Sequence, residues 1–188
     1  MSDLLSPSDN PRGYFIAAIA TLLCGLLLLL PAATLFQHGW NPPQRRWAGL
    51  GAWLYRLGLM ATIAVGISTP FQQPYVPVHI WLAFAAFMSL AAGLAVSLGV
   101  AAGSATSARW PLATLGALQV GALSFLAYLF CFAPAWFEDR RWLLAVCEWG
   151  LSALIAAGTV VVAATRAGVP SLAPRLRRPF THMRQNPE

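Results

Sequence analysis

Five long apolar runs, nearly free of charged residues, follow one another along this sequence. A bilayer's hydrocarbon core is about 30 Å thick, so a helix needs roughly 20 apolar residues to cross it. A soluble fold has nowhere to bury so much apolar surface, because 58% of the 188 residues are hydrophobic and 10% are charged. The sequence therefore predicts an all-α, polytopic transmembrane helix bundle. The five predicted helices span residues 13–36, 50–71, 79–101, 111–133 and 142–165.

Polar segments flank the predicted bundle, which as a whole spans residues 13–165. Residues 1–12 form a polar N-terminal segment whose Asp3 and Asp9 do not suit a cleaved signal peptide, so the first helix is expected to be retained. Residues 166–188 carry five arginines among several prolines, and we expect a disordered, basic cytoplasmic tail there. Such a tail favours contact with anionic lipid headgroups over nucleic acid.

Prolines and arginines suggest where the helices bend and end. Pro31 is expected to kink the first helix near its end. Arg45 and Arg46 are expected to lie in a short polar loop before the second helix. The second helix is expected to stop, and regular helix to be interrupted before the third, at Pro70, Pro74 and Pro77.

The distribution of arginines predicts which side of the membrane each end faces. One side of the predicted bundle holds eight arginines, and the other holds three. The eight are Arg45, Arg46, Arg109 and the five of the tail, and the three are Arg12, Arg140 and Arg141. Because positive charge stays cytoplasmic, the N-terminus is predicted outside and the C-terminus inside. All basic residues other than histidine are arginines, with no lysine, and Ala, Leu and Gly are abundant, which favours a bacterial inner membrane.

Small and aromatic residues gather in patterns typical of membrane helices. Gly99 and Gly103 have GxxxG spacing, which allows close helix packing within the chain or between subunits of a homo-oligomer. A second stripe with the same expected role comprises Ala83, Ala86, Gly93 and Ser97. Aromatic residues near the helix ends predict interface belts. One belt comprises Trp40, Trp47, Trp53, Tyr55 and Trp110, and the other comprises Tyr14, Tyr75, Trp81, Trp136 and Trp142.

Glu148 is the only acidic residue inside any predicted helix. An ionised carboxylate in hydrocarbon costs about 2.5 to 3.5 kcal/mol on insertion scales, so we expect it to face the bundle and find a partner. Ser152 lies one turn later on the same face, and His79 opens the third helix on the same predicted side. A His79–Glu148 pair could relay protons, bind a headgroup, act as acid and base, or only join two helices. The joining role is the favoured one.

Other polar residues in the predicted helices lie on the fourth. Gln119, Ser124 and Tyr128 could extend a cluster around His79 and Glu148, although ordinary interhelical hydrogen bonding is the favoured role.

The sequence predicts no metal site and no cofactor. The cysteines lie inside apolar runs without metal-ligand spacing and are expected to be small, buried apolar residues. They are Cys24, Cys131 and Cys147. Two histidines cannot meet to hold a haem, because His38, His79 and His182 are predicted at separate places across the bilayer or in the tail. Recognisable enzyme motifs are also missing.

Two short motifs stand out, namely His79, Ala83 and Phe87 at intervals of four, and Cys147, Glu148 and Trp149 near the start of the last helix. Together they resemble the DRAM-type family of damage-regulated autophagy modulators and related lipid-associated membrane proteins. The resemblance implies a membrane regulator or lipid-associated protein and singles out His79, Glu148 and Trp149. The family usually has six helices where five are predicted here, so its topology is not carried over. A bacterial family of helical membrane proteins with a similar His-led helix fits nearly as well.

The sequence is therefore compatible with three functions. The leading hypothesis is a non-enzymatic regulator, scaffold or lipid-associated component that works through an outward-facing polar cluster and contacts lipid or another membrane protein. The alternative is a transporter or proton-coupled channel subunit in which Glu148 titrates. The third is an intramembrane enzyme, for which an acid and base exist without a nucleophile or metal.

Overall fold

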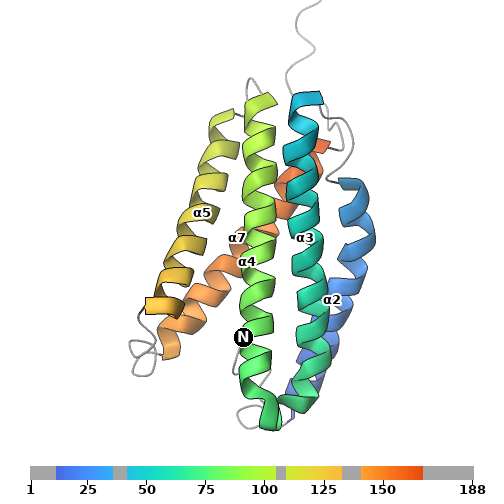
Figure 1. The fold of residues 1–188 in the computed structure, drawn as a ribbon, viewed down its shortest axis with the longest axis vertical. Coiled ribbons are helices and arrows are strands. Elements are labelled where there is room, and N and C mark those ends of the chain that lie inside the picture. Colours follow the sequence, from blue (N-terminus) through green and yellow to red (C-terminus); the bar gives the residue numbers. More distant parts are fainter. Residues whose placement is uncertain (1–11, 36–41, 105–108, 133–140, 167–188) are drawn as a thin grey trace, which may run out of the picture.

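The computed structural model describes residues 12–35, 42–104, 109–132 and 141–166, and in these residues all secondary structure is helical (Figure 1). The described residues form five long helices and one short 3₁₀ helix. They are α2 (Tyr14–Leu35), α3 (Pro42–Ser68), η1 (Thr69–Phe71), α4 (Gln72–Ser104), α5 (Arg109–Phe132) and α7 (Arg141–Arg166). The predicted all-α bundle of five helices is confirmed.

Four segments are long and apolar enough to cross a membrane. They are Pro42–Ser68, Val78–Ser104, Arg109–Leu129 and Val146–Thr165, and Tyr14–Leu29 forms a shorter apolar helix. The chain is therefore an integral membrane protein. Its orientation, with the N-terminus outside and the C-terminus inside, stays a prediction from the arginine count.

Arg45 and Arg46 do not lie in a loop, as predicted, because α3 begins at Pro42. The first residues of a helix do not use their N–H groups for intrahelical hydrogen bonds, so Pro42 and Pro43 fit the first turn. The prolines therefore start α3 eight residues before the predicted boundary, and they place both arginines on the first turn and a half of a helix.

The segment between the second and third predicted helices is helical, whereas the prolines there were predicted to interrupt regular helix. Pro70 lies in η1, and α4 begins directly afterwards at Gln72. Pro74 is the third residue of α4 and needs no donor, while Pro77 costs one hydrogen bond in a helix of 33 residues. The interruption is thus reduced to one short 3₁₀ turn. α2 continues through Pro31 to Leu35, in agreement with the predicted helix over 13–36, and the kink at Pro31 stays a prediction.

The helices run up and down, so their ends alternate between two sides (Figure 1). α4 packs against α3, α5 and α7, and α2 packs against α3. α7 crosses the other helices diagonally and contacts α5 and α2 as well as α4. One end of the bundle therefore holds the starts of α3 and α5. The opposite end, which we call the His79 end, holds the starts of α4 and α7.

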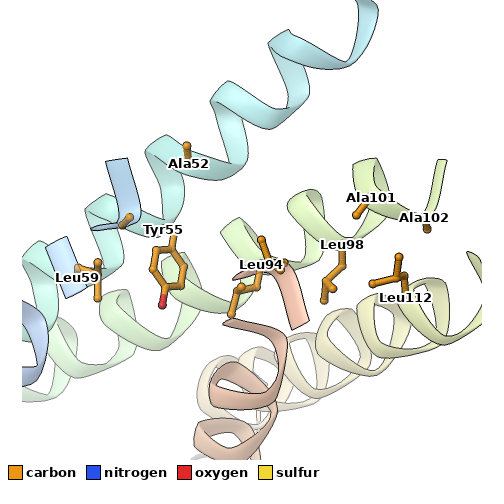
Figure 2. Packing of buried hydrophobic residues seen from close by; sticks show 10 residues of the cluster. Ala52, Tyr55, Leu59, Leu94, Leu98, Ala101, Ala102 and Leu112 are labelled. Atoms are coloured by element: carbon orange, nitrogen blue, oxygen red, sulfur yellow. The ribbon is translucent and has the colours of Figure 1, made fainter. Parts of the chain in front are cut away.

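The polarity of the fold is that of a lipid-embedded bundle. Large apolar side chains are exposed on all five long helices, including Leu27, Trp53, Trp81, Trp110 and Val160. The interior is built instead from small and medium residues. Its main cluster comprises Ala32, Ala52, Tyr55, Leu59, Leu94, Leu98, Ala101, Ala102, Leu112 and Val162, most of which are labelled in Figure 2. Small interior residues let helix backbones approach closely, as membrane helices require.

The closest helix approach lies between α3 and α4. A Cβ added to Gly93 would lie 2.6 Å from the backbone nitrogen of Tyr55, and one added to Gly58 would lie 2.7 Å from the backbone nitrogen of Leu90. The Ser97 hydroxyl, on the same stripe, donates to the Gly93 carbonyl at 2.8 Å. The predicted stripe that includes Gly93 and Ser97 therefore does mediate close packing, within the chain.

Candidate functional site

His79 lies about two turns into α4, at the His79 end of the bundle. It does not open the helix, contrary to the prediction, because α4 already begins at Gln72. Its ring is buried, with 8% of the residue exposed, and its Nδ1 lies 3.1 Å from the Ser68 hydroxyl oxygen. The Ser68 hydroxyl donates to the Val65 carbonyl at 3.1 Å, and Thr69 donates to the same carbonyl at 2.8 Å. When Ser68 donates in this way, its oxygen accepts a hydrogen bond from His79 Nδ1–H, which requires the His79 tautomer protonated at Nδ1. The cluster thus ties the start of α4 to the end of α3.

The structure brings His79 and Glu148 to the same end but does not join them. Among the described residues, the hydrogen bond of His79 goes to Ser68. The Ser152 hydroxyl, one turn after Glu148, donates to the Glu148 backbone carbonyl at 2.7 Å and so closes a bond within α7. Trp149 is 54% exposed and faces outward. The described contacts thus place His79, Glu148, Trp149 and Ser152 at one end of the bundle, and their joint role as a polar site stays a prediction.

A double-mutant cycle of His79→Ala and Glu148→Gln is expected to show additive losses of stability. Residues that share no partner usually add within about 0.5 kcal/mol, and the described partner of His79 is Ser68. The measurement is unfolding of the four proteins in detergent. A coupling of 1 kcal/mol or more, on the scale found for contacting residues, would show that the two side chains meet. The cycle His79→Ala with Ser68→Ala is the positive control.

A second polar group lies in the middle of the bundle and connects α5 to α7. Gln119 is fully buried, and its Nε2 donates to the Leu154 carbonyl at 2.7 Å. Gly158 makes room for this side chain, since a Cβ there would lie 2.8 Å from Nε2. The Gln119 Oε1 atom is buried and has no hydrogen-bond partner among the described residues. Gln119 thus has the interhelical hydrogen bond that the sequence analysis favoured.

Tyr55, on α3, also makes a hydrogen bond to α7. Its hydroxyl lies 3.0 Å from the Thr159 hydroxyl, and Thr159 in turn donates to the Ile155 carbonyl at 2.8 Å. Tyr55 is therefore the donor to Thr159, and the pair links α3 to α7. The prediction that Tyr55 belongs to an interface belt is wrong, because its ring is buried beside Leu59 and Leu94 (Figure 2). The belt prediction suits the exposed Trp47, Trp53 and Trp110.

Ser124 and Tyr128 share α5 with Gln119 but lie on its exposed side. Ser124 is exposed, and Tyr128 is exposed and stacks on Phe132 with ring centroids 5.8 Å apart. Both residues therefore lie on the outer face of α5, where lipid is expected.

The cysteines differ from the prediction in their burial. Cys24 and Cys131 are exposed and Cys147 is half-buried, so none is a fully buried packing residue. In the described ranges no three or more His, Cys, Asp or Glu side chains gather where they could hold a metal ion.

The GxxxG pair does not pack against another of the described helices. Gly99 and Gly103 instead line a groove of about 360 Å³ between α4 and α5, which we call the α4–α5 groove. Alanines and Gly116 form most of its remaining wall, Val120 lies at one end and Arg109 lies at the other. The sequence gives the helical spacing of these residues, but not the helix with which they would pack.

The fold and these sites define an integral membrane protein of the helical-bundle class. Comparisons with known protein families, with curated proteins and with solved structures give no match to this chain. The similarity to the DRAM-type family therefore rests on the short motifs around His79 and Glu148.

Proposed function

We propose that this protein is a non-catalytic, lipid-associated component of a membrane that acts as a regulator or scaffold. The observation that carries the proposal is the use of its polar groups. His79 bonds to Ser68, Gln119 bonds to Leu154, and Tyr55 bonds to Thr159. Each bond holds two elements of the bundle together, and large apolar side chains cover the outside.

Such a design favours contact with lipid over chemistry on a polar substrate. Interhelical hydrogen bonds in membranes contribute about 0.6 kcal/mol each on average, so their main effect is to specify which helices pack together. The exposed tryptophans and aliphatic side chains leave lipid as the immediate neighbour of every long helix.

A proton-coupled transporter or channel subunit is the second candidate, and one specific observation favours it. The buried Gln119 Oε1 has no donor in the part of the chain that the structure describes, which is unusual because buried polar atoms are normally paired. A water or a proton carrier in the bundle would satisfy it. Glu148, on the same helix as the Gln119 partner Leu154, would then supply the titrating group of such a pathway.

Proton flux into liposomes separates the two candidates. Wild-type protein reconstituted with an internal pH-sensitive dye is expected to dissipate a pH gradient no faster than protein-free liposomes. The Glu148→Gln variant is expected to give the same trace. A flux well above the protein-free rate that Glu148→Gln abolishes would favour the transporter, provided that circular dichroism shows the variant to be folded.

The location and orientation belong to the same proposal. The arginine count supports a bacterial inner membrane with the N-terminus outside and residues 166–188 at the cytoplasmic surface, where anionic headgroups attract a basic tail.

A further inference from the structure

The α4–α5 groove is a concavity that the described side chains do not fill. A Cβ added to Gly99 or to Gly103 would have no atom of the described residues within 4 Å. On the facing wall, a Cβ at Gly116 would reach only ordinary contact, 3.5 Å from the Leu98 Cβ. The glycines therefore face open space, whereas Gly93 of the same helix lies against backbone.

The length and lining of the groove suit a hydrocarbon chain. The wall formed by α5 runs from Arg109 to Val120, which is about 16 Å at 1.5 Å per residue. One leaflet of a bilayer has a hydrocarbon depth of about 15 Å, half of the 30 Å core. Between its two ends the wall carries only alanine and glycine on both helices. An acyl chain entering from one membrane face would meet no polar side chain along this path.

Positive charge marks the end of the groove where a headgroup would lie. Arg109 is exposed, lines the groove and begins α5. The up-and-down order of the helices places it at the same end as Arg45 and Arg46 (Figure 1). The one acidic side chain in the described residues, Glu148, lies near the start of α7 at the opposite end. This end therefore offers a phosphate several cations without a competing carboxylate from the described chain.

We propose that the α4–α5 groove binds an acyl chain of an anionic phospholipid, with Arg109 holding the phosphate. The inference rests on the proposed lipid-associated role and names the lipid class and its site. Arginine is suited to phosphate because its guanidinium donates two hydrogen bonds in parallel. The surrounding cations favour a headgroup with net negative charge over a zwitterionic one.

Charge also argues against a second copy of this chain as the occupant. A two-fold dimer with both copies in one membrane brings identical residues to the same face. If the grooves closed on each other, the two Arg109 side chains would meet there. Like charges at a contact are unfavourable, whereas an anionic lipid neutralises Arg109 in a monomer.

Native mass spectrometry in a neutral detergent tests the site, with dioleoyl phosphatidylglycerol and dioleoyl phosphatidylcholine as probes. Wild-type protein is expected to bind phosphatidylglycerol more tightly than phosphatidylcholine. Arg109→Gln should weaken that binding about tenfold, as expected for loss of a hydrogen bond to a charged group. Arg45→Gln removes a charge at the same end but outside the groove, and it should change the affinity less than about twofold, as for a single exposed charge.

A groove-filling variant tests the apolar part. Gly99→Leu places its side chain in the groove and is expected to reduce binding of both lipids. Gly121→Leu on α5 also enters open space but does not line the groove, so it should leave both affinities unchanged. Equal losses in Arg109→Gln and Arg45→Gln, or unchanged binding in Gly99→Leu, would overturn the site while the lipid-associated role stands. A wild-type dimer that Gly99→Leu converts to a monomer would identify a second copy as the occupant. Absence of lipid binding in wild type would overturn both the site and the lipid-associated role.

Discussion

Replacing Gly93 by leucine is expected to destabilise the protein by about 3 kcal/mol or more, at the upper end of overpacking effects. The Cβ alone would lie 2.6 Å from the Tyr55 backbone nitrogen and 2.8 Å from the Gly51 carbonyl oxygen. Backbone atoms of a packed helix cannot rotate away as a side chain can. α3 and α4 must therefore separate, which would also disturb the Tyr55–Thr159 contact. Unfolding in mixed detergent micelles measures the loss.

Gly99→Leu is the matched control, because Gly99 is on the same helix and has no atom within 4 Å of an added Cβ. Its expected effect on stability is within about 0.5 kcal/mol, as for a surface change. Equal destabilisation by the two substitutions would mean that the α3–α4 contact does not determine the effect, because leucine has a higher helix propensity than glycine at both positions.

Replacing Leu94 by alanine is expected to cost about 2 to 3 kcal/mol, at the lower end of the range for core truncations. Leu94 is fully buried, and its Cδ1 lies 3.5 Å from the Cβ position of Gly158. Leucine gains little by leaving lipid for the interior of a bundle, so the loss comes mainly from the missing packing contacts. Thermal unfolding of purified protein measures it.

Leu57→Ala on α3 is the control for that truncation. Leu57 is 42% exposed toward the surrounding lipid, which can fill the space left by a shorter side chain. We expect its unfolding temperature to stay close to that of wild type. A loss as large as that of Leu94→Ala would contradict the account, because burial within the bundle would then not determine the cost of truncation.

The helices themselves follow from the sequence because apolar length is a direct requirement of a bilayer. Their starts do not follow as easily. Pro42 and Pro74 are helix breakers in an interior position, yet both fit the first turn of a helix. Proline alone therefore does not show whether a segment ends one helix or begins the next.

Which small residues pack against a neighbour is also decided by the tertiary fold. Gly93 and Gly99 are both glycines in small-residue stripes of α4. The first touches the α3 backbone, and the second faces an open groove. Their positions differ by more than one and a half turns, so they face different directions, and only the position of each neighbouring helix distinguishes a contact from a groove.

For the polar residues, too, the sequence predicts the position along the bundle but not the hydrogen-bond partner. Alternation of helix direction was enough to predict that His79 and Glu148 share one end. The hydrogen-bond partner was not predictable, because Ser68 lies on the preceding helix and the short η1 turn brings it to the His79 ring. Tyr55 was assigned to a belt because aromatic residues near a helix end usually lie at the interface. Its buried partner Thr159 is 104 residues away, and no local pattern records that contact.

The lipid retained by the protein after extraction from its own membrane in a mild detergent tests the lipid-associated role most directly. Lipid analysis is expected to find anionic phospholipid enriched over the bulk membrane composition, and to find the same enrichment in Glu148→Gln and His79→Ala. Retained lipid that merely matches the bulk membrane, or enrichment that disappears when His79 or Glu148 is changed in a folded protein, would contradict the assignment of lipid contact to the arginine-bearing end.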